Sequence, residues 1–314
     1  MSHLKLVMLH RWVSILLGKT AVSLPQGIGK AYSLTEVKGF YNDLTLKVGS
    51  GTDLDPEGIP ISLLGENQHA YFPIAIFQYG LANYDLWLLQ KERSYYTAFE
   101  KLARWTLNQQ RPNGSWDCFG PIKSKKFTVS AMGQGEGAAL LLRAYRETGE
   151  LAFLQASRRA IDFMLLPIHL GGTAFYQPDG GIILEEYAHA DRSTVLNGWI
   201  FALFGLYDFC KTVPDSLYQE KLRQTVEALS ASLPAYDMGY WSQYDLAGKV
   251  ASPAYHTLHI ALLQVMFEIT GKEVFSVYAQ RWQEYLKQPG NQLRAVAHKF
   301  FQKLTEQTDT VIIK

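Results

Sequence analysis

A unit of about 60 residues recurs four times along the chain, and this repeat constrains the fold more than any other feature. In each unit, a segment rich in small and apolar residues precedes a more amphipathic segment. The first segments of three units end on aligned tyrosines, Tyr84, Tyr145 and Tyr207, which are 61 and 62 residues apart. Apolar residues recur at helical spacing in both segments, so each unit predicts a helical hairpin.

We expect paired helices at residues 73–90 and 95–110, 130–147 and 151–165, 194–210 and 216–233, and 255–270 and 273–287. One hairpin of this size cannot bury its apolar face alone, whereas hairpins stacked side by side in a ring can. The first helix of each pair carries glycine or alanine, which permits close approach, so we place these helices inside the ring. The sequence therefore predicts an all-α fold, an α/α toroid of about four helical hairpins.

The segments outside these helices complete the predicted organisation. Residues 180–186 and 240–246 follow outer helices and alternate like strands, so we expect short β-hairpins at one mouth of the toroid. Apolar residues on one stripe predict a further helix at 292–305. The predicted parts are an N-terminal arm or lid at 1–60, the toroid at 61–290, and a C-terminal helix and tail at 291–314.

The charge balance limits the choice of partner. With 30 Lys and Arg against 29 Asp and Glu, the net charge is +1, so no bulk positive field would hold a nucleic acid. The longest segment that resembles a targeting signal, residues 12–17, is shorter than the core of a signal peptide or a membrane span. We therefore expect a cytoplasmic protein without a membrane span. A homodimer is compatible with this sequence.

In a ring of hairpins, the loops that lead from an outer helix into the next inner helix meet at one mouth. Three such loops carry Tyr187, Tyr244 and Tyr255. They would lie near the N-terminal ends of inner helices, where free N–H groups and the helix dipole favour a bound carboxylate. A uronic acid carries such a carboxylate, so it is a natural ligand for this position. A phenol can exchange protons there if its phenolate is stabilised.

An acidic pair, Glu185 and Glu186, directly precedes Tyr187. On an extended segment neighbouring side chains point to opposite faces, so we expect at most one of the two to enter the cleft. We choose Glu186 because it is adjacent to Tyr187. The alternative is a pair of solvated surface acids.

Histidine, amide and tryptophan side chains complete the candidate site. His256 and His259 are three residues apart on one helical face, but no third ligand at a recognisable spacing accompanies them, so we expect cleft-lining groups and no metal. The glycine run at 133–137 lies within a helical repeat and lacks the third glycine of a dinucleotide-binding loop, so we expect no nucleotide cofactor. Tryptophans here either stack on sugar rings or fill the core. The remaining candidate substrate-binding residues are Asn197, Gln134, Trp116 and Trp241.

Nine short motifs occur in the order typical of one known family. They are YFPI (71–74), QYGL (78–81), SAMGQG (130–135), LEEY (184–187), LNG (196–198), GLYD (205–208), YDL (244–246), YHTLHI (255–260) and RW (281–282). The region from about residue 57 to 287 therefore resembles the C-terminal domain of the D-glucuronyl C5-epimerases of heparan sulfate and heparosan. Several independent motifs in register make this resemblance specific.

The resemblance implies an α/α barrel that inverts C5 of glucuronic acid residues within a polysaccharide, gives iduronic acid and needs no organic cofactor. It also implies that Tyr187, Tyr244 and Tyr255 are the catalytic tyrosines and that Glu186 takes part. The family usually has an arginine after the Tyr-Asp-Leu motif, where this chain has Ala247. Its loop to the Tyr-His motif is also longer than the 11-residue separation in this chain. These differences leave the identity of the polymer open.

We therefore expect an isomerase, an epimerase that converts D-glucuronic acid residues of a glycan to L-iduronic acid by proton abstraction and reprotonation at C5. Three alternatives stay open. A polysaccharide lyase shares the proton abstraction and then expels the substituent at C4. An inverting glycoside hydrolase needs two carboxylates, for which Glu186 and Asp245 are the available pair. A non-catalytic glycan-binding module would keep the ring and lack turnover.

Overall fold

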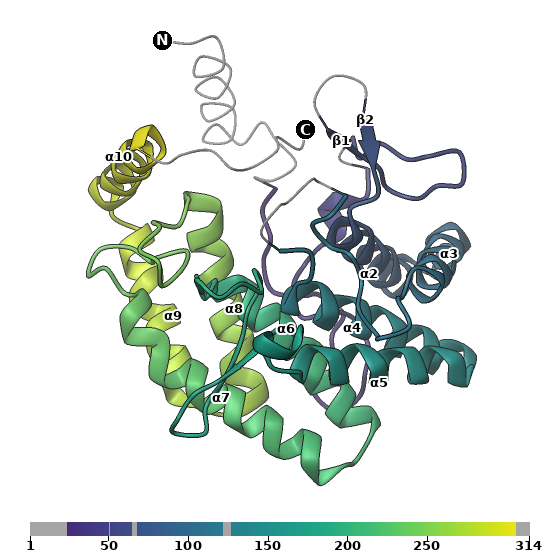
Figure 1. Cartoon of the computed structure of the whole chain (residues 1–314). Coiled ribbons are helices and arrows are strands. Elements are labelled where there is room, and N and C mark those ends of the chain that lie inside the picture. The colour runs from purple at the N-terminus through teal and green to yellow at the C-terminus, as the bar shows by residue number, and fades with distance from the viewer. Residues whose placement is uncertain (1–23, 50, 65–67, 122–126, 306–314) are drawn as a thin grey trace.

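The computed structural model describes residues 24–49, 51–64, 68–121 and 127–305. Most of this part of the chain lies in helices that form successive hairpins (Figure 1). The hairpins pair α2 (Pro73–Gln90) with α3 (Arg93–Asn108), α4 (Ala131–Thr148) with α5 (Leu151–Leu165), α6 (Leu196–Thr212) with α7 (Ser216–Tyr236), and α8 (Pro253–Thr270) with α9 (Glu273–Leu286). The eight expected helices are therefore confirmed, with ends that differ by at most three residues.

The first helices of the hairpins form an inner layer and the second helices form an outer layer (Figure 1). α4 packs between α2 and α6, α8 follows beside α6, and α3, α5, α7 and α9 lie outside. This is the α/α-toroid arrangement that the sequence predicts. Glycines set the closest approach, because a Cβ added to Gly205 of α6 would lie 2.3 Å from the carbonyl oxygen of Gly135 in α4.

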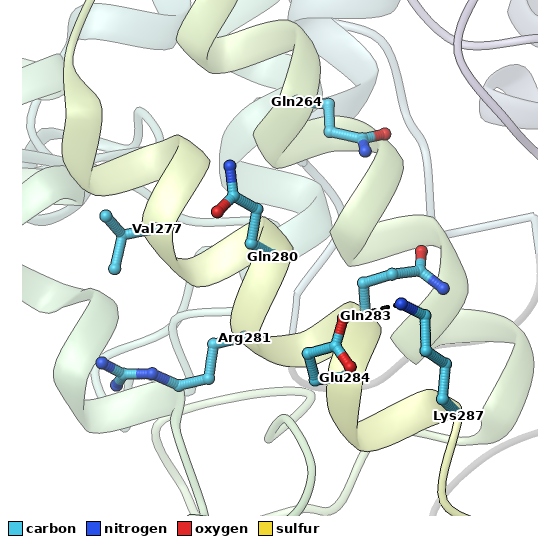
Figure 2. A pocket seen from close by; sticks show the side chains of 7 residues that line it. All are labelled: Gln264, Val277, Gln280, Arg281, Gln283, Glu284 and Lys287. Carbon is cyan, nitrogen blue, oxygen red and sulfur yellow. Dashed lines mark hydrogen bonds and ion pairs between the residues drawn. The ribbon is translucent and has the colours of Figure 1, made fainter.

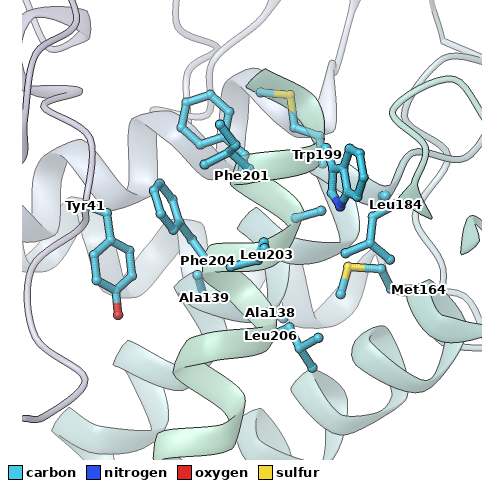
Figure 3. Packing of buried hydrophobic residues seen from close by; sticks show 14 of the residues in the cluster. Tyr41, Ala138, Ala139, Met164, Leu184, Trp199, Phe201, Leu203, Phe204 and Leu206 are labelled. Carbon is cyan, nitrogen blue, oxygen red and sulfur yellow. The ribbon is translucent and has the colours of Figure 1, made fainter. Parts of the chain in front are cut away.

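Large apolar side chains from the inner helices fill the core (Figure 3). Trp199 and Phe204 of α6 are fully buried, and Ala138 and Ala139 of α4 belong to the same cluster. Because alanine leaves room for an aromatic ring, large residues of one helix can pack closely beside small residues of the next. The indole N–H of Trp199 donates to Oγ1 of Thr225 in α7 at 2.8 Å, so the polar atom of this buried ring is also satisfied.

Two short antiparallel hairpins accompany the helices. They pair β1 (Ser62–Leu64) with β2 (Gln68–Ala70), and β3 (Ala174–Tyr176) with β4 (Ile182–Leu184). The β3–β4 hairpin, in which Ala174 lies opposite Leu184, confirms the strand-like character expected at 180–186. The second expected hairpin, at 240–246, takes the form of isolated bridges. The β1–β2 hairpin was not predicted.

Local sequence signals explain where two of the inner helices begin and end. Ser130 and Ser252 precede α4 and α8, and their hydroxyls accept backbone N–H groups of the first turn. Gly149 and Gly271 follow these helices with φ of 73° and 66°, a left-handed conformation that glycine adopts without strain. The caps fix the N-terminal ends of these helices, which face the mouth of the toroid.

Residues 32–41 of the N-terminal arm cross the C-terminal ends of the inner helices. Its contacts are Tyr32 with Glu268 of α8, Arg143 of α4 with the carbonyl oxygen of Gly39 at 2.9 Å, the Phe40 N–H with Asp85 of α2 at 2.9 Å, and the Tyr41 hydroxyl with Asp208 of α6 at 2.6 Å. Residues 32–41 therefore lie at the end opposite the mouth, whereas the charge of Lys47 acts on Glu136 in α4, and Asp55 accepts a hydrogen bond from Tyr71 just before α2. A lid formed by residues 1–23 would lie outside the described residues.

A last helix, α10 (Pro289–Thr305), follows the hairpins and begins three residues before the expected helix at 292–305. It packs against α9 and α8 (Figure 1). Residues 306–314 of the expected tail lie outside the described residues. In the part of the chain that is described, no helix combines the length and the apolar character needed to cross a bilayer.

Candidate active site

The three tyrosines expected at the mouth lie together. The hydroxyl oxygens of Tyr187 and Tyr244 are 3.3 Å apart, and the ring centroids of Tyr244 and Tyr255 are 4.9 Å apart. Tyr187 follows β4, Tyr244 lies in the loop between α7 and α8, and Tyr255 lies in the first turn of α8. All three side chains are partly exposed. The expected convergence of residues that are distant along the chain is therefore observed.

The loop that carries Tyr244 is fastened to the N-terminal end of α6. The carbonyl oxygen of Tyr244 accepts the N–H of Leu196, the first residue of α6, at 3.1 Å. Its own N–H donates to the carbonyl oxygen of Lys249 at 2.6 Å, which closes a tight loop. Val195 and Asp245 form a β-bridge beside it. The backbone at Tyr244 is thus fixed by both neighbouring segments.

The acidic pair separates in the way the sequence predicts. Glu185 accepts hydrogen bonds from the N–H and the hydroxyl of Thr194 at 2.9 and 2.6 Å, so it serves to hold this loop. Glu186 turns the other way and lies beside the Tyr187 hydroxyl. Burial raises the pKa of Glu186 to about 7, although the neighbouring hydroxyl of Tyr187 opposes this shift. Near neutral pH this carboxyl can therefore both accept and give up a proton.

Glu186 also touches the first turn of α6. A Cβ added to Gly198 would lie 2.3 Å from Oε2 of Glu186, so the carboxylate packs directly on the helix backbone. The neighbouring Asn197 is 3% exposed. Within the described residues, Oε2 of Glu186 and Oδ1 of Asn197 have no hydrogen-bond partner. Two buried acceptor atoms therefore lie at the positive end of α6.

Burial governs the ionisation of the phenols. It raises the pKa of Tyr187 and Tyr244 well above the usual value near 10, and it raises the pKa of Tyr255 to about 12. The negative charge of Glu186 acts in the same direction on all three. The phenols are therefore protonated at neutral pH, and a phenolate requires a group nearby that takes its proton.

A second buried acid, Glu136 of α4, escaped the sequence analysis. Its Oε1 accepts a hydrogen bond from Nε2 of Gln78 in α2 at 2.9 Å, whereas its Oε2 has no partner among the described residues. Burial raises the pKa of Glu136 to about 8, the Gln78 hydrogen bond and the charge of Lys47 lower it, and the charge of Glu186 raises it. The available signal was a single acid in a run of glycine and alanine that imitates a nucleotide-binding loop.

His256 and His259 are fully buried and support the loops that carry the tyrosines. The carbonyl oxygen of Trp282 lies 3.0 Å from Nε2 of His256, and because a carbonyl can only accept, this nitrogen carries the proton. Nδ1 of His256 then accepts from the backbone N–H and hydroxyl of Ser242, at 3.2 and 2.8 Å. Burial lowers the pKa of His256 to about 4, so the ring is neutral. Trp241 stacks on it with ring centroids 3.7 Å apart.

Two further candidates, Trp116 and Gln134, lie in the core with no exposed surface. Oε1 of Gln134 accepts the backbone N–H of Trp116 at 3.1 Å, and its Nε2 donates to the carbonyl oxygens of Gly114 and Ala160 at 3.0 and 3.2 Å. The indole N–H of Trp116 donates to the carbonyl oxygen of Thr106 at 2.8 Å. Because their polar groups are bonded within the protein, neither side chain offers a polar atom to a substrate.

A surface hollow lies elsewhere, between α8 and α9 (Figure 2). It has a volume of about 570 Å³ and is lined by Gln264, Val277, Gln280, Arg281, Gln283, Glu284 and Lys287. None of the expected site residues lines it. Its carboxylate, Glu284, is 65% exposed and is paired with Lys287 at 2.7 Å, so it lacks the buried ionisable groups of the tyrosine cluster. In the described ranges no three His, Cys, Asp or Glu side chains are grouped as metal ligands.

Comparison with known proteins bears on this site directly. Residues 109–284 match the family described as D-glucuronyl C5-epimerase C-terminus. The chain belongs to this family. It is 30% identical over 226 residues to the D-glucuronyl C5-epimerase of Caenorhabditis elegans, and 31% identical over 149 residues to an uncharacterized protein of Methanocaldococcus jannaschii. These matches cover 63% and 46% of the chain, and 36% and 48% of the two relatives, so the chain spans less than half of either.

Two solved structures have a distant likeness to the chain. The first is the unsaturated glucuronyl hydrolase of Bacillus sp. GL1, with a TM-score of 0.44 and 15% identity over 71% of this chain and 61% of that one. The second is a polysaccharide lyase, with a TM-score of 0.46 and 13% identity over 76% of this chain and 75% of that one. The family match includes all three tyrosines and Glu186.

Proposed function

We propose that this chain is a carbohydrate C5-epimerase, an isomerase that converts D-glucuronic acid residues of a polysaccharide or oligosaccharide to L-iduronic acid. The observation that carries the proposal is the meeting of Tyr187, Tyr244 and Tyr255 beside Glu186, in a chain of the D-glucuronyl C5-epimerase family. We assign the catalytic roles to these four residues, and we keep Asn197, His256 and His259 as residues that shape the substrate site.

The chemistry requires donors around the sugar carboxylate. The C5 proton lies α to this carboxylate, so its removal places a second negative charge on the group. Donors that are already oriented can stabilise this charge without reorganising. The hydroxyls of the tyrosine cluster and the N-terminal end of α6 are such donors, and the partial positive charge of the helix end acts in the same direction.

Inversion requires two proton carriers. One phenolate takes the C5 proton, the electron pair left at C5 is shared with the carboxyl group, and the hydroxyl of a second tyrosine delivers a proton to the opposite face. We assign the first carrier to Tyr187, because Glu186 lies beside its hydroxyl and can take its proton. The second carrier is then Tyr255. Tyr244 contacts both, so it can return the transferred proton and restore the starting state.

Turnover in deuterated water tests the proposal. An epimerase places deuterium at C5 of glucuronate residues and yields iduronate, and NMR detects both. A lyase instead produces a double bond that absorbs in the ultraviolet, and a hydrolase produces new reducing ends that depend on Asp245 as well as Glu186. A glycan-binding module retains the oligosaccharide without exchange. Unlabelled hexuronate after long incubation with a panel of glucuronate-containing glycans would contradict the proposal.

A further inference from the structure

The C-terminal helix α10 is hydrogen-bonded to the loop that carries Tyr244. Oε1 of Gln302 accepts the N–H of Val250 at 3.0 Å, and its Nε2 donates to the carbonyl oxygen of Gly248 at 2.7 Å. Nζ of Lys299 donates to the carbonyl oxygen of Val250 at 2.6 Å. Three hydrogen bonds therefore connect one turn of α10 to Gly248 and Val250, in the C-terminal part of this loop.

Backbone contacts connect these three hydrogen bonds to Tyr244. Val250 is bridged to Gln243, and the N–H of Tyr244 donates to the carbonyl oxygen of Lys249 at 2.6 Å. On its other side Tyr244 is bonded to Leu196 at the start of α6. The Tyr244 backbone thus lies between α6 and α10, and movement of either helix would shift the phenol relative to Tyr187.

Lys299 also brings a positive charge to the site. Its Nζ lies 5.6 Å from the centroid of the Tyr244 ring, within the range in which a cation is attracted to an aromatic face. A nearby cation favours the phenolate over the phenol. Lys299 lies beyond residues 109–284, so the part of the chain that matches the family does not include it.

Other side chains of α10 dock the helix on Tyr240 and on the cluster around Trp241, against which Tyr244 also packs. The Arg294 guanidinium lies 3.8 Å from the ring centroid of Tyr240, and the Tyr240 hydroxyl is 3.1 Å from Nδ1 of His298. Ala295 is buried in a cluster with Trp241. The docking of the helix and the placing of Lys299 can therefore be separated by substitution.

We propose that Lys299 and Gln302 are positioning residues for Tyr244: they fix its loop so that the phenol meets Tyr187, and the charge of Lys299 stabilises the phenolate during proton transfer. This inference rests on the proposed epimerase function. Among the ionisable groups around Tyr244, Glu186 and Tyr187 after β4 and Tyr255 of α8 disfavour the phenolate. Asp245 and Lys249 of the same loop pair with each other at 3.9 Å, and the charge of Lys299 also acts on Asp245. Lys299 brings a positive charge from α10 to the face of the Tyr244 ring.

Fluorine NMR of protein labelled with 3-fluorotyrosine tests the charge directly, because the fluorine resonance reports the electrostatic environment of each ring without turnover. The Tyr244 signal is assigned by its loss in Tyr244→Phe. In Lys299→Met at pH 7 we expect this resonance to shift, because the ring loses the cation near its face. In Lys299→Arg, which keeps a positive charge, and in Arg294→Met, which removes a docking contact of the same helix, we expect little shift. An unchanged Tyr244 resonance in Lys299→Met would overturn the electrostatic role.

The positioning role is read from backbone amide exchange of residues 243–250 and from kinetics. Gln302→Met should speed amide exchange in this loop and lower kcat for C5 deuteration by about tenfold with little change in KM. Arg294→Met should leave kcat near that of the parent. Unchanged exchange and kcat in Gln302→Met would overturn the role. If the parent chain itself does not label C5, the proposed function fails, while the fluorine resonance of Tyr244 and amide exchange still decide the role of α10.

Discussion

Gly198 lies against the carboxylate of Glu186 so closely that no side chain fits between them. A Cβ at position 198 would lie 2.3 Å from Oε2 and 2.6 Å from Cβ of Glu186. Real Cβ atoms do not approach other atoms so closely, and the carboxylate has little room to retreat because Glu186 is 6% exposed. Glycine at this position is therefore needed to place the acid beside Tyr187.

Gly198→Ala is expected to displace Glu186 and lower the rate of C5 deuteration by about tenfold or more. The steric contact should also lower the stability of the fold. Alanine favours a helix over glycine by about 0.5–1 kcal/mol, so part of this loss should be offset. The rate is measured by NMR and the stability by thermal unfolding. Gly290→Ala is the control, because a Cβ there meets nothing within 4 Å. Parent-like activity in Gly198→Ala would show that Glu186 tolerates displacement.

Removing the hydroxyl of Tyr187 or Tyr255 should have a much larger effect. A positioned proton carrier contributes about 10²- to 10⁴-fold to the rate, so Tyr187→Phe and Tyr255→Phe should each lose activity on this scale. Tyr176→Phe serves as the control, because its hydroxyl donates to the carbonyl oxygen of Leu165 in another part of the fold. Deuterium incorporation at C5 is the measurement. Equal rates in Tyr187→Phe and Tyr176→Phe would remove Tyr187 from the mechanism.

The repeat explains why much of this site is predictable from sequence. Tyr187 and Tyr244 occupy equivalent loops, each between an outer helix and the next inner helix, so any ring of hairpins brings them to one mouth. The alternation of an extended segment also separates Glu185 from Glu186 correctly. These predictions need the order of elements and the period of the pattern, and both are visible in the sequence.

Contacts between units were not predictable in the same way. Glu136 meets Gln78 because α2 packs beside α4, and nothing in either helix specifies the partner. The hydrogen bond from Lys299 to Val250 depends on how α10 folds back onto an earlier loop. Trp241 illustrates a third limit, because a tryptophan that stacks on a histidine and one that stacks on a sugar have the same sequence signal.

Glu186 should impose a pH dependence on the reaction. Burial raises its pKa to about 7, and only the ionised carboxylate can take a proton from Tyr187. The rate of C5 deuteration should therefore rise as the pH increases through about 7, and this limb should vanish in Glu186→Gln along with most of the activity. Rates measured from pH 5 to 8 at constant ionic strength test this. A flat profile in the parent would show that the carboxyl is not the proton acceptor.

Glu136 should make the fold less stable at higher pH. Its pKa is raised from about 4.5 to about 8, so the folded state binds a proton that the unfolded state has lost, and stability falls as the pH rises between these values. The shift corresponds to about 1.4 kcal/mol per unit. Glu136→Gln keeps an acceptor for Gln78 and should gain unfolding free energy over the parent from pH 5 to 8. Urea unfolding at pH 5 and at pH 8 measures the unfolding free energy of both proteins. The same change with pH in the parent and in Glu136→Gln would contradict the prediction.

At the opposite end of the inner helices, Arg143 and Asp208 form an ion pair with no exposed side-chain surface. Nη1 of Arg143 lies 2.7 Å from Oδ2 of Asp208, and the Tyr41 hydroxyl donates to Oδ1 at 2.6 Å. Asp208 therefore ties α4, α6 and the N-terminal arm together. Removing one partner leaves a charge and a hydroxyl buried without their acceptor, which is costly in a medium that excludes water.

Asp208→Ala is expected to lower the free energy of unfolding by about 3–5 kcal/mol, the usual cost of an uncompensated buried charge. Because the arm loses one of its anchors on α6, proteolytic cleavage near Tyr41 should also become faster. Glu220→Ala is the matched control, since its pair with Arg223 lies on the outer surface of α7 and both side chains are exposed. Urea unfolding and limited proteolysis are the measurements. If both variants unfold like the parent, the arm is held by its apolar contacts and not by this pair.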